Sequence, residues 1–276
     1  MRSIADQTAQ ELGGGLSVLV RQQRDHVALD GLLHELDGAT GPAQQQVLRR
    51  IDRLVFPHAF AEESVLWPVM RRVLPDGEAL TLEIEREHQE VNELVTRLER
   101  MRLDDPARPP VLDRLTAVLR EDVRDEEDEL LPRLQAVVGR RQLQLLGLLW
   151  QVVDAIAPTR AHPVVARRPP GNVVAALPLS AIDRVRDVVD ARVQEDGGGA
   201  VLRAAGVGLR ELAHAVEHLP IMGRGEDPAT RSDRRLPGSR WTGTAVAATA
   251  VVVVALLRRR RSRRPGDGRR EARSSG

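Results

Sequence analysis

The residues of this sequence that could do chemistry occur as one motif written twice. In the segment HAFAEESVLWP, His58 is followed four residues later by Glu62 and then by Glu63. The segment DVRDEEDELLP repeats this order, with Asp122 in the place of the histidine and Glu126 in the place of the first glutamate. Side chains four apart on an α-helix lie one turn above each other on the same face. Each pair can therefore reach one metal ion.

Two further histidines form a second repeated pair. His26 lies in DHVALDGLL and His88 lies in the matching segment EHQEVNELV, 62 positions later. Repetition of this kind predicts a pseudo-twofold site, to which each of four helices contributes one face. The chain has no cysteine, which excludes disulfides, thiolate ligands and cysteine nucleophiles. A histidine and carboxylate site of this kind fits iron or manganese better than structural zinc.

The second glutamate of each doublet is less well placed to bind the metal ion. On a regular helix Glu63 lies about 140° round from His58 and should face another way. The acidic run RDEEDE at 124–129 is expected to be solvated, apart from Glu126. The first glutamate of each doublet is therefore the predicted ligand.

Polar residues one turn beyond the lone histidines have two possible roles. Asp30 follows His26 by four positions, and Asn92 follows His88 by the same spacing. Each is either a partner that orients a ligand or a polar residue at the edge of the bundle. His34, two turns beyond His26, is expected to be a histidine at the surface or at the core edge.

Helical periodicity predicts the elements that position these residues. The expected helices span about 16–36, 43–74, 78–103 and 111–138, with a further helix at 140–156 that caps the bundle. Pro57 is expected to begin a new helical stretch just before His58. Short connections favour antiparallel neighbours. The fold class is thus all-α, an up-down-up-down four-helix bundle that forms a metal-binding domain over residues 15–156.

This pattern resembles the hemerythrin-like family, also called the HHE cation-binding domain, over residues of about 16–137. The resemblance implies a non-haem di-iron site, with manganese as the alternative metal. The ligands that carry over are His26, His58, Glu62, His88 and Glu126. Asp122 stands where the family usually has a fourth-helix histidine, and we include it as a sixth candidate ligand. Asn92 stands where oxygen-carrying hemerythrins place a second histidine on the third helix.

Both departures argue against simple reversible oxygen carriage. They favour a protein that binds, reduces or senses a small oxidant, namely O2, peroxide or nitric oxide, with a redox partner that the sequence does not specify. The alternatives are a metal-responsive or iron-storage module and a structural, membrane-associated helical protein. Three buried carboxylates would be costly without metal, so metal binding and bundle stability should be coupled.

The chain beyond the bundle divides by composition. Residues 157–172 are rich in proline and arginine and predict a linker or extended arm, and residues 173–220 predict amphipathic helices. His214, Glu217 and His218 spell HxxEH, an arrangement known from inverted zinc proteases. No third ligand segment of the expected kind follows them, which disfavours a protease.

The C-terminal end predicts membrane association. Residues 241–257 carry no charge, and six arginines occur among the next seven residues, at the start of a basic tail over 258–276. A helix of that run spans roughly 25 Å, slightly less than a bilayer core of about 30 Å, a gap that snorkelling arginines can close. We expect a single membrane helix here, with an interfacial or re-entrant segment, or one packed on the domain, as alternatives.

The N-terminus lacks the apolar core of a secretory signal, so the bundle is expected on the cytoplasmic side of a membrane. A soluble cytoplasmic protein is the alternative. The basic tail lacks interleaved aromatic residues, and therefore predicts no specific nucleic-acid partner.

Overall fold

The computed structural model describes residues 1–195 and 199–232, and all regular secondary structure within these two ranges is helical. The described residues divide into two compact units, one made of residues 1–184 with 213–232 and the other of residues 185–195 with 199–212. All six candidate ligands lie in the first unit. The predicted all-α class is confirmed for the described residues.

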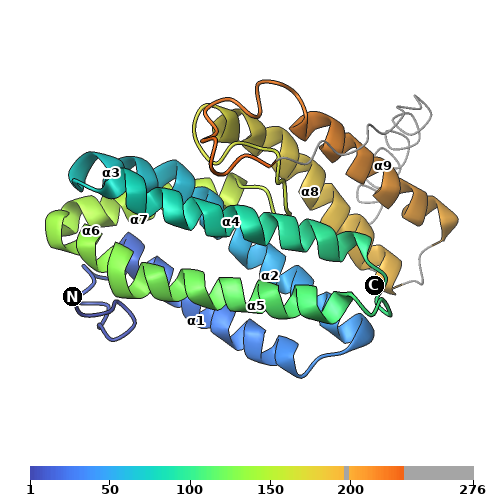
Figure 1. Cartoon of the computed structure of the whole chain (residues 1–276), viewed down its shortest axis with the longest axis horizontal. Coiled ribbons are helices and arrows are strands. Elements are labelled where there is room, and N and C mark those ends of the chain that lie inside the picture. The colour runs from blue at the N-terminus through green and yellow to red at the C-terminus, as the bar shows by residue number, and fades with distance from the viewer. Residues whose placement is uncertain (196–198, 233–276) are drawn as a thin grey trace, which may run out of the picture. The chain divides into compact units, whose positions relative to one another are not determined.

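Four helical rods form the bundle of the first unit (Figure 1). The first rod is α1 (Val18–Asp37), and the third is α4 (Gly77–Arg100). The second consists of α2 (Gly41–Ala61), the π-helical turn η1 (Glu62–Leu66) and α3 (Trp67–Val73). The fourth consists of α5 (Arg108–Asp125), the π-helical turn η2 (Glu126–Leu130) and α6 (Leu131–Val137). Short turns reverse the chain at alternate ends, as expected for an up-down-up-down bundle.

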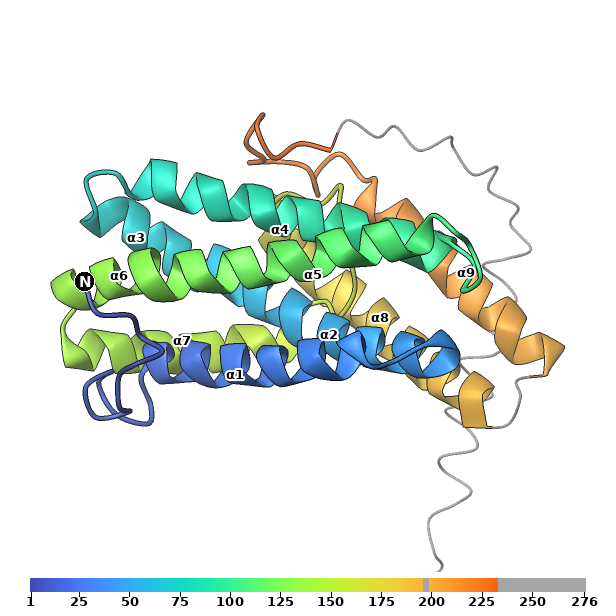
Figure 2. The same cartoon turned by 60° about the horizontal axis from the view of Figure 1, so that its bottom comes forward.

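A further helix, α7 (Arg140–Ile156), runs beside α1 and packs against α1 and α2 (Figure 2). Its Trp150 is buried, and the indole meets the His58 ring edge-on with ring centroids 5.0 Å apart. A Cβ at Gly147 would come within 2.0 Å of the carbonyl oxygen of Leu16, so only glycine permits this close approach. The helix expected at 140–156 therefore does cover the bundle, along its side.

Two buried apolar clusters flank a polar layer in the middle of the bundle. On α1, Leu19 belongs to one cluster and Leu29 to the other, and His26 lies between them. The fourth rod has the same arrangement, with Leu119 in one cluster and Leu130 in the other. The layer that holds the candidate ligands is thus closed off by hydrocarbon on both sides.

Each rod that carries a glutamate doublet contains one π-helical turn. The N–H of Trp67 donates to the carbonyl of Glu62, five residues earlier, and the equivalent bond in η2 ends on Glu126. Pro68 and Pro132 are the second residues after the ends of these turns. A proline has no N–H, and its ring crowds the carbonyl four residues earlier, so a widened turn relieves the clash.

The expectation that Pro57 begins a new helical stretch is wrong. Pro57 lies inside α2, which runs without a break to Ala61. The change in helical geometry comes later, at the π-helical turn that begins with Glu62. This places the interruption at the ligand residues themselves.

Two more helices, α8 (Gly171–Glu195) and α9 (Ala200–Glu217), occupy most of the region expected to form amphipathic helices. Among the described residues, no helix combines the length and the apolar character needed to cross a membrane. The apolar run 241–257 and the basic tail 258–276 lie outside the described residues.

Residues 157–170, which we call the arginine strap, belong to the first unit and pack on its helices. Arg160, His162 and Arg167 of the strap are all buried. The backbone N–H of His162 donates to Oδ1 of Asn92 on α4 over 2.9 Å, and the guanidinium of Arg168 lies 2.7 Å from Glu85. The composition that predicted a linker or extended arm therefore belongs to a packed segment.

His162 is enclosed between two carboxylates. Its Nδ1 lies 2.9 Å from Oε2 of Glu217, and its Nε2 lies 3.1 Å from Oδ2 of Asp183. Burial by itself would lower the pKa of His162, but the two carboxylates outweigh it and raise the pKa to about 9. A buried imidazolium thus ties the strap to α8 and α9.

We predict that His162→Gln lowers the free energy of unfolding by up to about 3 kcal/mol at or below pH 6.5. The folded-state pKa is raised, so this contribution is complete below the unfolded-state pKa and disappears as the pH rises through about 9. Urea unfolding of both proteins between pH 6 and 10 measures the difference. His34→Gln, at an exposed histidine, is the control. A difference that does not change with pH would contradict the ion pair.

Candidate metal centre

The structure brings the predicted ligands together in the middle of the bundle. Ligand atoms of His26, His58 and Glu126 lie within 4.8 Å of one another, and so do those of Glu62, His88 and Glu126. All five side chains are buried. The two groups share Glu126, which is the arrangement expected when a carboxylate serves two ions.

Glu62 also faces both groups. Its Oε1 lies 3.3 Å from Nε2 of His58, and its Oε2 lies 3.4 Å from Nε2 of His88. Glu126 approaches the first group through Oε2, 3.1 Å from Nε2 of His26. The two glutamates thus stand between the histidines, where bridging ligands of a metal pair would lie.

Asp122 adds a carboxylate on one side only. Its Oδ1 lies 3.6 Å from Nε2 of His88, and its side chain is largely buried. The group around His26 therefore contains two imidazoles, because His58 belongs to it, whereas the group around His88 contains one imidazole and an extra carboxylate. The two groups therefore offer different sets of donor atoms to a metal ion.

The site passes a direct test of fit to metal ions. Buried atoms in it have no hydrogen-bond partner, namely Nε2 of His58, both carboxylate oxygens of Glu62 and of Glu126, and Oδ1 of Asp122. Buried polar atoms are almost always partnered, because an unpartnered one costs free energy. Cations at the centre would partner all of them. Imidazole nitrogens and carboxylate oxygens together suit iron or manganese.

The second glutamate of each doublet accepts a hydrogen bond from the ring nitrogen of a ligand histidine that faces away from the centre. Nδ1 of His26 donates to Oε1 of Glu127 over 3.0 Å, and Nδ1 of His88 donates to Oε1 of Glu63 over the same distance. Each bond fixes the ring and leaves Nε2 toward the centre. Carboxylates in this position orient metal-binding histidines and raise their basicity.

These two contacts correct the sequence analysis. Glu63 was expected to face away from the site, and the run containing Glu127 was expected to be solvated. Both expectations assumed a regular helix, and the π-helical turns change the direction of successive side chains. The repetition of the second glutamate in both halves of the chain was the signal available in the sequence.

Asp25 is a further residue that the sequence analysis missed. Its Oδ2 lies 3.4 Å from Nδ1 of His58. Burial would raise the pKa of Asp25, but the contact with His58 and the neighbouring Arg24 lower it overall. All three ligand histidines therefore have a carboxylate on the nitrogen that faces away from the centre.

The polar residues one turn beyond the histidines do not touch the ligand rings. Asp30 is exposed and lies 3.4 Å from His34, which is a surface histidine as predicted. Asn92 is buried, and its amide donates to the backbone carbonyl of His88 while its Oδ1 accepts from His162. Asn92 is thus neither a ring partner nor an edge residue, and it links α4 to the strap.

Without metal, the electrostatics of the site favour protonation. Burial would lower the pKa of His26, but Glu126 and Glu127 raise it to about 9. Burial and neighbouring carboxylates raise the pKa of Asp122 and of Glu126 to about 7. Protons thus neutralise part of the negative charge of the crowded carboxylates when no cation is bound. Metal binding should release these protons.

A small cavity of about 20 Å³ adjoins the candidate ligands. Leu29, Phe56 and Val91 form part of its wall, and the three ligand histidines and Asp122 form another part. This volume suffices for one water-sized molecule.

The HxxEH residues also come together, within 4.8 Å, at the end of α9. Oε2 of Glu217 accepts a hydrogen bond from His162, and Nδ1 of His218 donates to the carbonyl of His214. The role that the structure shows for Glu217 is that of counter-ion to a buried histidine.

Comparison with known proteins agrees with this geometry. Residues 18–134 match the family model described as the hemerythrin HHE cation binding domain. This part of the chain is therefore similar to the hemerythrin family. All six candidate ligands lie inside the matched hemerythrin range, whereas the arginine strap lies outside it.

An uncharacterised hemerythrin-like protein of Schizosaccharomyces pombe is 26% identical over 134 residues. The aligned part covers 48% of this chain and 66% of that relative, so about a third of the relative has no counterpart in the alignment. No solved structure matches the chain.

We predict that Glu127→Gln weakens metal binding about 10-fold to 100-fold, because an amide oxygen is a poorer acceptor for Nδ1 of His26 than a carboxylate. Competition with a chelator measures the affinity. Glu129→Gln, two residues on and exposed, is the matched control and should bind like the wild type. Equal behaviour of the two variants would remove Glu127 from the site.

Proposed function

We propose that the hemerythrin domain holds a non-haem di-iron centre and that the protein binds, reduces or senses a small oxidant, namely O2, peroxide or nitric oxide. The observation that carries this proposal is the set of buried, unpartnered histidine and carboxylate atoms that converge from four rods. Manganese is the alternative metal, because it accepts the same donor atoms.

Each residue has a separate part in this function. His26 and His58 would hold one ion and His88 with Asp122 the other, while Glu62 and Glu126 would bridge them. When bound, iron supplies the capacity to coordinate and exchange electrons with a small oxidant. The apolar cavity beside the histidines would admit such a molecule and exclude larger ones.

The donor set supports redox chemistry or sensing over reversible oxygen carriage. Asp122 places an anion where an imidazole is usual in the family, and an anionic ligand stabilises the ferric state over the ferrous one. Asn92 faces the strap and the backbone of α4, so it does not replace the absent histidine as a ligand. Three imidazoles and three carboxylates leave positions open for an exogenous ligand.

A second candidate function is iron storage or iron sensing through folding. The buried acidic cluster favours it, because the cost of burying three unpartnered carboxylates links metal occupancy to bundle stability. The two functions differ in what metal removal does. A sensor of this type loses helicity with its metal, whereas an oxidant-binding protein with a robust core retains its helicity.

Membrane attachment remains a proposal from sequence alone. It depends on the uncharged run 241–257 and the arginines that follow. We propose that this segment tethers a bundle on the cytoplasmic side. Fractionation of cells that express the full chain, compared with a chain ending at residue 232, tests the tether directly.

We predict that the purified full-length protein contains two iron ions per chain and absorbs in the near ultraviolet when oxidised. His58→Ala with Glu62→Ala removes one terminal ligand and one bridge, and should abolish this absorption and most of the iron. His34→Ala, an exposed histidine, is the control and should leave both unchanged. Elemental analysis and spectra before and after addition of peroxide measure the outcome.

Wild-type protein from iron-replete cells that carries no iron and no colour would contradict the di-iron proposal. Iron that is present but spectroscopically unchanged by peroxide, O2 and nitric oxide would favour storage. Loss of helical circular dichroism on chelation would favour folding-coupled sensing.

A further inference from the structure

We propose that Arg167 of the arginine strap is a positioning residue for the metal centre, which it serves by holding the Glu63 carboxylate against His88. This inference rests on the proposed function, because it assumes that His88 binds metal. It adds a residue from outside the matched hemerythrin range to the centre, and it makes the two metal positions depend on different parts of the chain.

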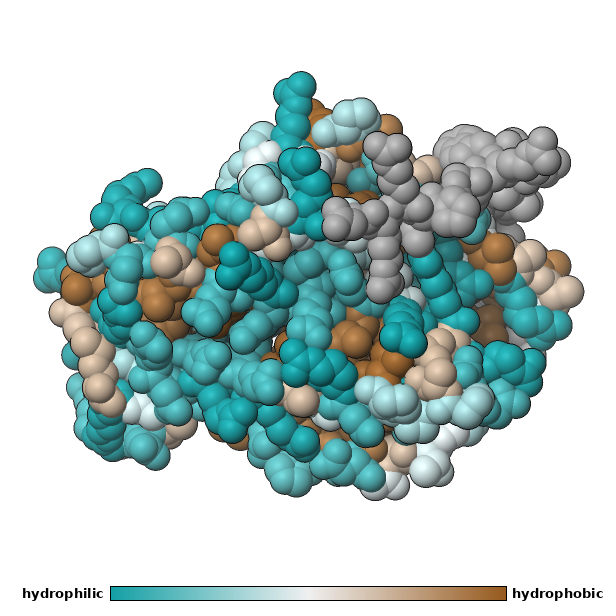
Figure 3. Space-filling view, viewed as in Figure 1, coloured by the Kyte–Doolittle hydropathy of each residue, from teal (hydrophilic) through white to brown (hydrophobic). Residues whose placement is uncertain are grey.

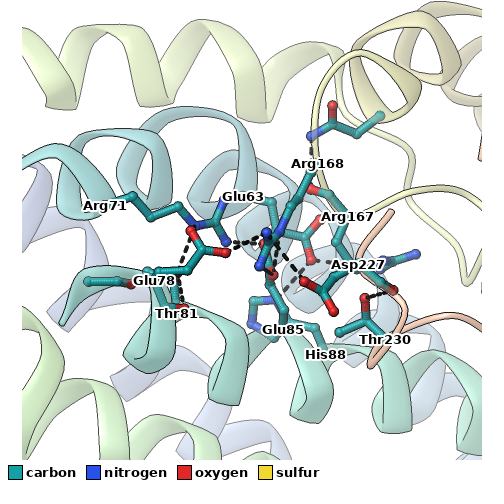
Figure 4. A network of polar contacts seen from close by, with 12 residues as sticks. Glu63, Arg71, Glu78, Thr81, Glu85, His88, Arg167, Arg168, Asp227 and Thr230 are labelled. Carbon is teal, nitrogen blue, oxygen red and sulfur yellow. Dashed lines mark hydrogen bonds and ion pairs between the residues drawn. The ribbon is translucent and has the colours of Figure 1, made fainter. Parts of the chain in front are cut away.

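The chain of contacts is short and direct. Nη1 of Arg167 lies 3.8 Å from Oε1 of Glu63, and the same oxygen accepts the hydrogen bond from Nδ1 of His88 over 3.0 Å. Figure 4 shows Arg167 and Glu63 beside each other above His88. The guanidinium is therefore one carboxylate away from a metal ligand.

Both side chains of the Arg167–Glu63 contact are buried, so solvent screens their charges little. Glu63 is 2% exposed, and Arg167 is 7% exposed. A buried carboxylate needs a nearby cation to remain charged. Arg167 supplies this cation to Glu63, and the Glu63 oxygen that faces Arg167 also accepts the N–H of His88.

The strap holds Arg167 in place from several sides. Its Nη2 donates to the backbone carbonyls of His162 and Val165, each over 3.0 Å, and its own carbonyl accepts from Asn172. Its backbone N–H donates to a carboxylate oxygen of Glu226. The guanidinium is thus fixed before any metal binds, which is a requirement for a positioning role.

The other half of the pseudo-symmetric site lacks this support. Glu127 occupies the position equivalent to Glu63 and holds His26. Its side chain is 14% exposed, and among the residues that the structure describes no arginine lies within 4.0 Å of it. Water can stabilise this carboxylate, whereas Glu63 depends on Arg167. Loss of Arg167 should therefore affect the His88 position selectively.

Arg168 provides a matched control in the next position of the chain. It pairs with Glu85 over 2.7 Å and with Glu78 over 2.6 Å, in a network that Arg71 also joins (Figure 4). The Arg168 side chain is 17% exposed, against 8% for Arg167, and it fastens the same strap, but none of its contacts reaches a ligand histidine. Its removal tests the strap without touching the centre.

The experiment compares Arg167→Met, Arg167→Lys and Arg168→Met in the full chain. Affinities for the two equivalents of ferrous iron are measured by chelator competition, and Mössbauer spectra resolve the two iron sites. We expect Arg167→Met to weaken one equivalent about 10-fold and to change one of the two iron signals. Lysine should restore much of the loss, and Arg168→Met should lower the melting temperature alone.

The outcomes separate the inference from the proposed function. A wild-type chain that binds two irons, with Arg167→Met and Arg168→Met indistinguishable in affinity and spectrum, overturns the positioning role alone. A wild-type chain that binds no iron overturns both. If Arg167→Met does not fold, Glu63→Gln with and without Arg167→Lys decides. If Arg167→Lys changes the iron affinity equally in the wild-type and the Glu63→Gln background, the inference is overturned. If its effect on iron affinity disappears in the Glu63→Gln background, the inference is supported.

Figure 3 shows that this face of the molecule is largely hydrophilic, with apolar residues in small areas.

Discussion

The need to partner buried acidic and imidazole atoms at one level of the bundle governs the rest of this structure. Carboxylate oxygens of Glu62 and Glu126 have no hydrogen-bond partner, and apolar clusters lie on both sides of them. Hydrocarbon packing stabilises the two ends of the bundle and keeps water away from the middle. The same packing that stabilises the fold thus raises the free energy of a metal-free centre. Fold stability is therefore linked to metal occupancy.

The π-helical turns connect this constraint to the covalent chain. A regular helix lets one residue of each glutamate doublet face the centre, whereas the widened turn lets both contribute, one toward the metal position and one behind a histidine on a neighbouring rod. The prolines that follow each doublet favour the wide turn. One local distortion therefore supplies both a ligand and its support, twice, in pseudo-symmetric positions.

The two halves have nevertheless become unequal. Asp122 replaces an imidazole on one side, and the same side receives a buried carboxylate supported by the arginine strap. The other side has two imidazoles and a partly solvated supporting carboxylate. Unequal donors favour unequal metal affinities at the two groups, which supports the proposed redox or sensing function over reversible oxygen carriage.

The sequence by itself determined the helical class, the bundle and the six residues that meet in it, because a repeat with fixed helical spacing constrains which side chains share a face. It could not determine which way Glu63 and Glu127 point, since that depends on turns that leave the regular period. It also read residues 157–172 as a linker, because composition reports proline and arginine but not the buried carboxylates that arginine side chains reach. Only tertiary packing brought Arg167 to Glu63, across more than 100 residues of chain, and placed the strap beside the carboxylate that contacts His88.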